Sequence, residues 1–552
     1  MTVLSLSVID RPVMASAQAK RNYILCGRVV NHKMEEKRKI ARTASIVGGA
    51  TLLSRLAGLG RDLATSYFFG TTAAAAAFVV AFRIPNLFRR LLGEGALTVA
   101  FVPVFTQTIQ EGGQPAAKEL FRRMFTLLAL VLAVLSTLGV IFAPEIVTVM
   151  APGFRDDPET FGLTVFLTRV LFPYIFLMGL GALFMGALNS RGYFAAPALG
   201  PFMGNLAMIA GTVFLSSQFD LPILGLALGA MAGGLLQIGI QLPSLHRAGL
   251  SLTPKFDFRS PEVRRILILM GPAALGAAVY QLSVFINTIL GSFLPEGSIP
   301  YLYYADRLMQ FPLGIFTVAI GTAALPALSR QSARGDQQGF IESARFALGL
   351  SFFITVPAMA GLAIMAEPLV AFLFQRGVFT AESTLGTAAA LQAYVLGLPF
   401  LSGASILARV FYSRSNTRTP TLAAAVSLVA STVSALILMW PLAHVGLALA
   451  SSISSLVNFF WLYRLLIIRE NDFPQREFLK EAGSYFLLAA VMAAAVWPFS
   501  AWATAATSFW GLAAKTLAGV AVGVAVYFLL SLMTRRPHLI PLVNLIKRKF
   551  RR

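Results

Sequence analysis

Cysteine, histidine and charged residues are scarce in this chain of 552 residues. The single cysteine, Cys26, excludes a disulfide framework and a cysteine-based metal site. The four histidines lie far apart, at positions 32, 246, 444 and 538, and therefore predict no metal-ligand cluster. Charged residues make up 12% of the chain and hydrophobic residues 57%, whereas a soluble domain carries roughly 25% charged residues. The composition indicates a protein that faces lipid.

Apolar stretches of about 20 residues, long enough for a helix to cross a bilayer, recur along the whole chain. We predict an all-α integral membrane protein with fourteen transmembrane helices, of which the second and eighth extend into the cytoplasm. The predicted spans are 41–69, 73–104, 121–150, 160–189, 195–217, 221–245, 263–293, 298–329, 340–366, 383–412, 419–440, 443–467, 479–500 and 509–533.

Lysine and arginine are distributed unevenly between alternate loops. When the N-terminus is placed in the cytoplasm, the outside loops hold only Arg155, Arg376 and Lys515. Cytoplasmic loops of membrane proteins carry an excess of these residues. We therefore expect both termini in the cytoplasm, and we interpret the formal net charge of +21 as an orientation signal, with no nucleic-acid partner.

The sequence also contains an internal repeat. The segment 143–150 resembles 366–373, and Pro103 corresponds to Pro326, an offset of 223 residues. A unit of that size holds six helices, so two copies would be parallel repeats around a central site. The predicted regions are a disordered extension or mis-assigned start (1–33), an N-lobe (34–260), a C-lobe (261–470), two additional helices (471–535) and a basic cytoplasmic tail (536–552). The alternative for 1–33 is a cytoplasmic tail, not a cleavable signal peptide.

Charged residues inside the predicted spans are the main functional signal. Arg55 lies about 20 Å deeper than Arg42 at about 1.5 Å per residue, near the middle of the bilayer. Arg61 and Asp62 follow on the same helix, where Asp62 shares a helix face with Arg55. A central arginine normally faces a cavity or a partner. Arg307 in the eighth helix has a similar depth to Arg61, and no nearby opposite charge on a shared helix face suffices to neutralise the whole set of arginines.

The second helix adds Arg83, Arg89, Arg90 and Glu94. Arg89 and Arg90 lie toward the cytoplasmic end, so snorkelling to the interface is an alternative role for them, and Arg61 with Asp62 could be a simple intramembrane pair. Arginines nonetheless exceed carboxylates by about three in these helices. Several guanidinium groups around one space suit a phosphate-rich ligand, because they bind its oxygens in bidentate geometry.

Several long motifs occur in the order typical of one transporter family. They read Ser54-Arg55-Leu-Ala-Gly-Leu-Gly-Arg61-Asp62, Phe82-Arg-Ile-Pro-Asn86-Leu-Phe-Arg-Arg90, Gly93-Glu94-Gly95-Ala96, Tyr303-Tyr-Ala-Asp-Arg307-Leu-Met-Gln-Phe-Pro312 and Phe411-Tyr-Ser-Arg414. From about residue 40 to residue 535 the chain closely resembles the MurJ (MviN) lipid II flippases, within the multidrug/oligosaccharidyl-lipid/polysaccharide exporter superfamily.

The resemblance implies a V-shaped pair of lobes around a cationic cavity in the bacterial inner membrane, and a role in peptidoglycan synthesis and cell shape. It implies that Arg55, Arg61 and Arg307 hold the diphosphate of lipid II and that Asp62 orients the arginines. Arg89 and Glu94 would line the cytoplasmic side or a lateral portal, the thirteenth and fourteenth helices would hold the polyprenyl tail, and alternating access would be the mechanism. The remaining candidate substrate-binding residues, from the same motifs, are Ser54 and Asn86. The implied partners are lipid II, membrane lipids and cell-wall synthesis or division proteins.

The chain departs from some relatives at the positions of a sodium site. Asn287 stands where they carry an aspartate, the eleventh helix has no carboxylate, and Gln310 replaces a glutamate. Ala76 likewise stands near a position that is acidic in many members. The resemblance therefore implies no metal or other cofactor here, and the energy source stays open.

Two alternatives remain. A flippase for another polyprenyl-diphosphate-linked oligosaccharide, of the O-antigen or capsule type, would need the same diphosphate chemistry. A membrane enzyme acting on polyprenyl phosphates would need an acid–base or metal constellation at the interface. We find no such set and interpret Asp156 and Asp157 as a solvated turn, so we predict a transporter and not an enzyme.

Overall fold

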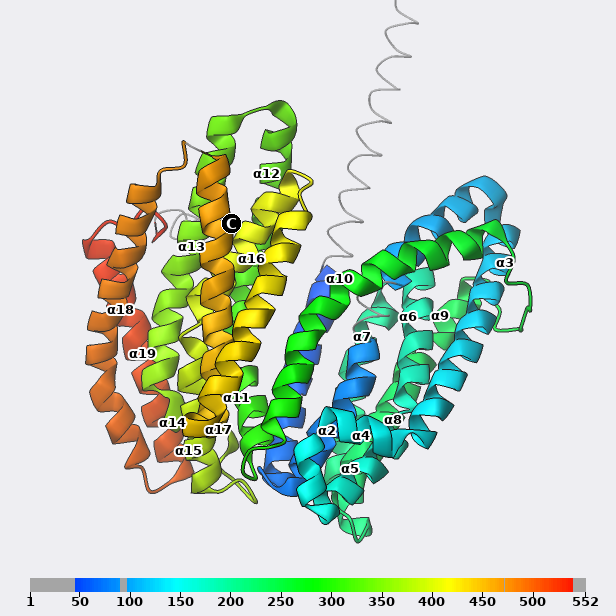
Figure 1. Ribbon diagram of the computed structural model, residues 1–552, viewed down its shortest axis with the longest axis horizontal. Coiled ribbons are helices and arrows are strands. Elements are labelled where there is room, and N and C mark those ends of the chain that lie inside the picture. The colour runs from blue at the N-terminus through cyan, green and yellow to red at the C-terminus, as the bar shows by residue number, and fades with distance from the viewer. Residues whose placement is uncertain (1–44, 90–96, 471, 540–552) are drawn as a thin grey trace, which may run out of the picture.

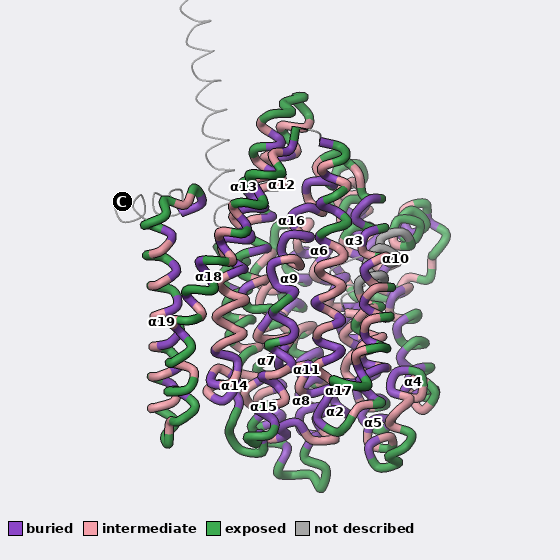
Figure 2. Tube along the Cα trace, turned by 60° about the vertical axis from the view of Figure 1, so that its left-hand side comes forward, coloured by how far each residue is buried: buried purple, intermediate pink, exposed green. Residues whose placement is uncertain are grey.

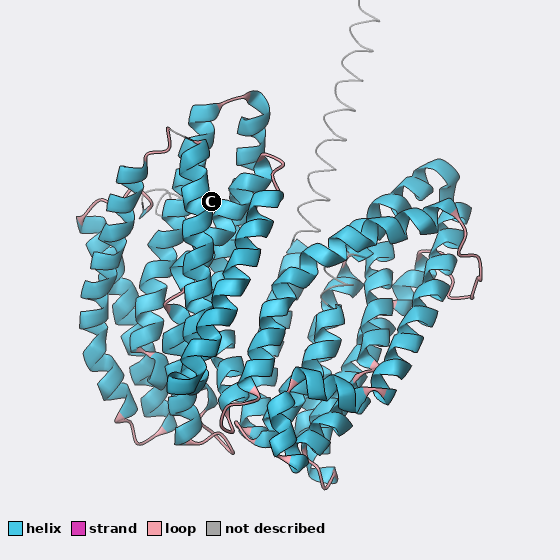
Figure 3. Ribbon diagram, in the orientation of Figure 1, coloured by secondary structure: helices cyan, strands magenta, loops and turns pink. Residues whose placement is uncertain are grey.

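The computed structural model describes residues 45–89, 97–470 and 472–539, and every regular element within these ranges is a helix (Figure 3). The expected all-α membrane fold is confirmed. The predicted extension over 1–33 and the end of the basic tail lie outside the described residues.

The helices form two packed groups that meet at one end and spread apart at the other, which gives a V (Figure 1). We call the first group the N-lobe. It contains a helix over residues 45–69 followed by α2 (Ala73–Arg89), α3 (Leu97–Ile141), α4 (Ala143–Met150), η2 (Pro152–Asp156), α5 (Pro158–Leu171), α6 (Tyr174–Ser190), α7 (Ala195–Ala210), η3 (Gly211–Leu215), η4 (Ser216–Gln218), α8 (Ile223–Gly239) and α9 (Leu242–Arg247).

The second group, the C-lobe, follows a long connecting helix, α10 (Pro261–Gly291). It contains α11 (Ser298–Pro312), η5 (Leu313–Thr317), α12 (Val318–Arg334), α13 (Gln337–Ile364), α14 (Ala366–Phe374), α15 (Ala381–Val395), α16 (Leu398–Ser413) and α17 (Arg418–Arg469), with α18 (Gln475–Thr504) and α19 (Phe509–Met533) on its outer face. The start of α10 contacts α3 through Arg265 and Gln107, and its end contacts α17 through Asn287 and Ser451. Thus α10 joins the two lobes.

Local sequence signals set several helix ends. Asp157 caps α5 by accepting hydrogen bonds from the backbone of Glu159 and Thr160 at 3.1 and 3.2 Å, which gives the predicted solvated turn a structural role. Ser260 caps α10 just before Pro261. Gly335 ends α12 at a φ of 70°, a left-handed conformation that favours glycine.

The predicted count of fourteen spans stays a prediction. Within the described ranges, nine helices are long and apolar enough to cross a membrane, or ten if the pair α15 and α16, bent by 43°, is one span. The long helices explain part of the difference. α17 bends sharply at Ala443 (φ 45°), and Ser454 Oγ contacts Ser427 O at 2.9 Å, so its two halves lie side by side as two predicted spans. α3 also continues beyond residue 104, through a break at Gly113.

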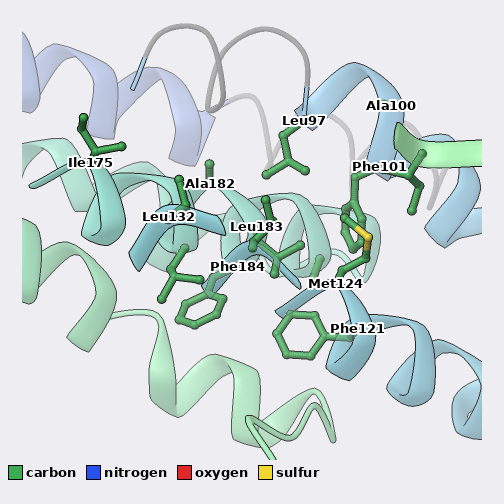
Figure 4. Packing of buried hydrophobic residues seen from close by; sticks show 14 of the residues in the cluster. Leu97, Ala100, Phe101, Phe121, Met124, Leu132, Ile175, Ala182, Leu183 and Phe184 are labelled. Atoms are coloured by element: carbon green, nitrogen blue, oxygen red, sulfur yellow. The ribbon is translucent and has the colours of Figure 1, made fainter. Parts of the chain in front are cut away.

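Aromatic and aliphatic side chains fill the interior of each lobe. In the N-lobe, Phe101 and Phe105 stack with ring centroids 4.9 Å apart, and Phe121 and Phe184 pack beside them (Figure 4). The outer helix α19 buries one face, which includes Ala513 and Tyr527, and exposes the other along its length (Figure 2), where Trp510 is 79% exposed. Exposed apolar side chains on this scale fit a surface covered by lipid.

Candidate functional site

A cavity of about 1330 Å³ lies between the two lobes. It is lined by the helix over 45–69, α2, α7 and α8 on one side, and by α10, α11, α16 and α17 on the other. Its lining runs along the helix over 45–69 from Thr65 to Gly48 and includes Thr421 near the start of α17. Most of the sequence-predicted site residues line it, namely Ser54, Arg55, Arg61, Asp62, Asn86, Arg89 and Arg307. Glu94, like Arg90, lies outside the described residues.

The deep end of the cavity holds an ion-paired cluster from both lobes, which we call the Asp62 cluster: Arg61, Asp62, Tyr303 and Arg307. Asp62 is only 5% exposed. It accepts hydrogen bonds from Arg61 Nη2 at 2.7 Å and from the Tyr303 hydroxyl at 3.1 Å. Arg307 Nε lies 3.5 Å from Asp62 Oδ2. Arg307 thus has a carboxylate partner that comes from another helix, in the other lobe, and not from its own helix face.

Tyr303 supports the second arginine of this cluster in two ways. Its hydroxyl accepts a hydrogen bond from Arg307 Nη2 at 3.1 Å, and its ring lies under the same guanidinium, 4.8 Å from Cζ to the ring centroid. A cation above an aromatic face is attracted by the ring quadrupole. Tyr303 therefore fixes the direction in which Arg307 points.

Asn205 on α7 holds the first arginine of the cluster and the helix that carries it. Its Oδ1 accepts a hydrogen bond from Arg61 Nη1 at 3.1 Å, and its Nδ2 donates one to the backbone oxygen of Ser54 at 3.1 Å. The predicted site residue Ser54 thus contributes a backbone atom to this contact. Neither Asn205 nor Tyr303 was a sequence candidate. Tyr303 lies in a motif that pointed to Arg307, whereas nothing in the sequence marked Asn205.

Arg55 differs from the other two core arginines because it is exposed to the cavity. No hydrogen bond or ion pair links it to another residue of the described ranges. Its guanidinium lies against Gly314 of η5, where an added β-carbon would be 2.8 Å from Arg55 Nη1. The shared helix face of Arg55 and Asp62 does not bring them into an ion pair, since the contacts of Asp62 are with Arg61, Tyr303 and Arg307.

Helix α2 carries the remaining cationic side chains. Arg83 donates hydrogen bonds to Val284 O at 3.1 Å and to the Thr288 hydroxyl, and so joins α2 to the connecting helix α10. Arg89 Nε donates to Asn86 Oδ1 at 2.9 Å. The described residues that line the cavity include two aspartates and five arginines. The aspartates are Asp62 and Asp306, and the arginines are Arg55, Arg61, Arg83, Arg89 and Arg307. The cavity is therefore strongly cationic.

The opposite wall, from α10 and α17, is polar but uncharged. It contains Asn287, whose Nδ2 contacts Ser451 Oγ at 3.4 Å, together with Gln281, Ser427, Ser454, Ser455 and Asn458. In the part of the chain that the structure describes, no three histidine, cysteine or acidic side chains lie together as metal ligands. These neutral amides and hydroxyls suit an uncharged, hydrogen-bonding part of a ligand.

The lobes are joined by a set of hydrogen bonds at the closed end of the V, which we call the seam. Val378 N donates to Tyr67 O at 2.9 Å, and the hydroxyls of Thr71 and Ser383 lie 2.7 Å apart. The Tyr304 hydroxyl donates to Gly70 O at 3.3 Å. Further contacts join Ala73 N to Glu296 Oε1 at 2.8 Å and Gly153 N to Ser292 Oγ at 3.1 Å. These hydrogen bonds hold the closed end of the V together.

Comparisons with known proteins agree on one family. Residues 65–535 match the family model described as lipid II flippase MurJ. The chain is 34% identical over 507 residues to a probable lipid II flippase MurJ of Vibrio cholerae, covering 90% of this chain and 96% of the relative. It is 36% identical over 461 residues to the lipid II flippase MurJ of Burkholderia cenocepacia, covering 82% and 89% of the two chains.

Two solved structures are also similar to this chain. A lipid II flippase MurJ in an inward closed conformation matches with a TM-score of 0.73 and 28% identity, over 89% of this chain and 98% of the other. An inward-facing multidrug transporter of the MATE family matches with a TM-score of 0.65 over 76% and 96% of the two chains. At 14% identity, the second match shows a shared fold alone.

Proposed function

Because the chain belongs to the MurJ family of lipid II flippases, we propose that it moves lipid II from the cytoplasmic to the periplasmic leaflet of the bacterial inner membrane. The protein is a multi-pass membrane protein. It carries its substrate across without chemical change, so we propose a transporter and not an enzyme.

The main support for this proposal is the excess of arginines over carboxylates in the central cavity. A diphosphate presents many anionic oxygens, and guanidinium groups bind such oxygens in pairs while staying charged at physiological pH. Arg55 faces the open cavity without an ion-pair partner among the described residues. It would meet the diphosphate first, and Arg61 and Arg307 would then exchange part of their contact with Asp62 for contact with the ligand.

The rest of the headgroup would lie against the neutral polar wall. The amides of Gln281, Asn287 and Asn458 line the side of the cavity formed by α10 and α17. Sugar hydroxyls and peptide amides need hydrogen-bond partners once they leave water. The lipid tail would remain outside, and we propose that α18 and α19 provide its apolar groove.

The distribution of basic residues supports an orientation in which the cavity opens to the cytoplasm. The end of α12 and the segment before α10 lie at the wide end of the V (Figure 1) and carry Arg330, Arg334 and Arg259, whereas Arg155 and Arg376 lie near the seam. Cytoplasmic loops are enriched in such residues. Both chain termini would then be cytoplasmic.

Alternating access would require the seam to break and the wide end to close. Ligand binding can drive that change only if the ligand binds one state more tightly than the other. The Asp62 cluster has side chains from both lobes, so rocking the lobes changes its geometry. It is therefore the part of the site whose affinity for a diphosphate would differ between the states.

Depletion of the resident flippase in a host bacterium, with this gene supplied, tests the function. We expect externally added label to detect lipid II at the outer leaflet. Arg55→Ala should abolish most of this labelling, whereas Arg330→Ala, which removes an exposed charge outside the cavity lining, should preserve it. Normal labelling with Arg55→Ala would refute the site. Rescue of an O-antigen or capsule flippase mutant, without rescue of lipid II labelling, would identify the alternative substrate.

A further inference from the structure

The segment between α9 and α10 is attached to the outer edge of the N-lobe. We call residues 251–260 the strap. It runs beside α3, on the side of the N-lobe away from the C-lobe (Figure 1). Lys255 N donates a hydrogen bond to Thr126 Oγ1 at 2.8 Å, and Lys255 Nζ forms an ion pair with Glu119. Asp257 forms a second ion pair, at 2.8 Å, with Arg123.

Alternate residues of the strap point in opposite directions, as in an extended chain. Lys255 and Asp257 form ion pairs with α3 and are half-buried, whereas Phe256 and Phe258 are exposed. Phe256 is 72% exposed and Phe258 is 36% exposed, and their ring centroids lie 6.4 Å apart. The strap therefore presents an aromatic pair to the surroundings of the protein.

Basic residues continue from this aromatic pair into the first turn of α10. Arg259 and Arg264 are both exposed, and neither forms an ion pair within the described ranges. The carboxylate of the strap itself, Asp257, is already paired with Arg123. The outward surface of the strap is thus apolar and cationic together.

The contact with Thr126 fixes the depth of the strap. From Met124 to Ile141, α3 contains no charged residue, and this stretch is roughly 27 Å long at about 1.5 Å per residue, close to the hydrocarbon thickness of about 30 Å. Thr126 lies in the first turn of that stretch, next to Arg122 and Arg123. The strap therefore lies at the boundary between hydrocarbon and headgroups.

We propose that the strap is a membrane-interface anchor that binds anionic phospholipids of the cytoplasmic leaflet. Phe256 and Phe258 insert between the lipid headgroups, and Arg259 and Arg264 contact lipid phosphates. Aromatic side chains flanked by basic ones are typical of such interfacial contacts. This assignment of the leaflet rests on the orientation proposed above. Because the strap leads directly into α10, the anchor holds the start of that helix at the N-lobe rim.

A nitroxide at position 256 tests the anchor without measuring transport. Cys26→Ser removes the single native cysteine, and Phe256→Cys then provides the labelling site. In vesicles of phosphatidylcholine with phosphatidylglycerol, we expect the label to be more accessible to oxygen than to a water-soluble nickel chelate. The matched control is Ala333→Cys, an exposed position at the end of α12, where we expect the opposite order.

The lipid charge provides the second arm of the test. Omitting phosphatidylglycerol should raise the accessibility of the label to the nickel chelate. In the double variant Arg259→Gln with Arg264→Gln, the accessibility should be the same with and without phosphatidylglycerol. If the label at position 256 is as accessible to the chelate as the label at position 333, the proposal is overturned. The aromatic surface of the strap would then bind a soluble protein partner instead of lipid. Equal accessibility in both lipid mixtures would overturn the anionic-lipid part. Neither result depends on lipid II movement, so failure of the anchor is distinguishable from failure of the transport function.

Discussion

The Tyr303 hydroxyl of the C-lobe donates a hydrogen bond of 3.1 Å to Asp62 Oδ1 of the N-lobe. The same oxygen accepts a hydrogen bond from Arg61 Nη2. One buried carboxylate is therefore shared between a residue of its own helix and a residue of the opposite lobe. A contact of this kind depends on how the lobes are arranged, so it links the charge balance of the cavity to the conformational state of the protein.

Replacement of Tyr303 by phenylalanine should reduce transport while preserving the fold. The variant retains the ring under Arg307 but loses the hydroxyl that contacts Asp62 and Arg307. Hydrogen bonds to charged groups contribute about 1.5–3 kcal/mol, so we expect external lipid II labelling to fall by about tenfold or more. The matched control is Tyr412→Phe, because Tyr412 lines the same cavity and its hydroxyl has no hydrogen bond within the described residues. Equal labelling by the two variants would contradict the role given to Tyr303.

Asp62→Asn should destabilise the protein because it leaves two neighbouring arginines without their shared counter-charge. Breaking a fully buried pair costs about 3–5 kcal/mol. The side chains of Arg61 and Arg307 are 15% and 33% exposed, so water reduces the loss to about 1–3 kcal/mol. A lower unfolding temperature in detergent would show this effect. Asp156→Asn, in an exposed turn, is the control and should leave the temperature unchanged. An unchanged unfolding temperature for Asp62→Asn would show that the pair has no net stabilising role.

Hydropathy was enough to predict the all-α membrane fold, because it depends on local composition. The break of α17 at Ala443 falls at the boundary between the predicted spans 419–440 and 443–467. The continuation of α3 between the predicted spans 73–104 and 121–150 was not predicted. Ala443 adopts a φ of 45°, a conformation that no local signal for alanine indicates, and Gly113 interrupts a helix that continues on both sides.

The positions of the arginines along their helices were readable from the sequence, but their partners were not. Arg307 and Asp62 are separated by more than two hundred residues in the chain, and only the packing of α11 against the N-lobe brings them together. Helical periodicity instead placed Arg55 on the same face as Asp62, where it forms no ion pair. Periodicity identifies a shared face within one helix and carries no information on what the opposite lobe presents to it.

Close packing of α7 and η3 against α8 provides a stability prediction. A β-carbon added at Gly229 would lie 2.8 Å from the backbone oxygen of Ala207, whereas one added at Gly239 would meet nothing within 4 Å. Both glycines belong to α8. Gly229→Ala should therefore lower the unfolding temperature, while Gly239→Ala should leave it unchanged or raise it, since alanine favours the helix by about 0.5–1 kcal/mol. The reverse order would show that the two helices can separate at little cost.

Glycine at position 70 is needed to close the seam. Its φ is +53°, and an added β-carbon would lie 2.7 Å from Val378 O, beside the hydrogen bond from Val378 N to Tyr67 O. Gly70→Ala should therefore separate the lobes at this end and shift the population toward a state open there. Distances between spin labels across the seam should lengthen. Gly162→Ala, with no atom within 4 Å of the added carbon, should leave the distance distribution unchanged, and the same distribution for Gly70→Ala would refute the seam as a gate.

His538, in the segment after α19, should make stability depend on pH. Its Nδ1 lies 2.7 Å from the Tyr485 hydroxyl, and its ring stacks on Phe346 with centroids 5.1 Å apart. Burial lowers the pKa of His538 from its ordinary value of 6.5; Glu481 opposes this shift and Arg345 adds to it. The unfolded chain then binds more protons than the folded one below about pH 6.5, so stability falls as the pH drops through that range, by at most about 1.4 kcal/mol per pH unit. The unfolding temperature in detergent, measured from about pH 7.5 to about pH 5.5, should fall less steeply for His538→Phe than for the unmodified protein. Parallel curves would mean that His538 accepts its proton as readily in the folded state as in the unfolded chain.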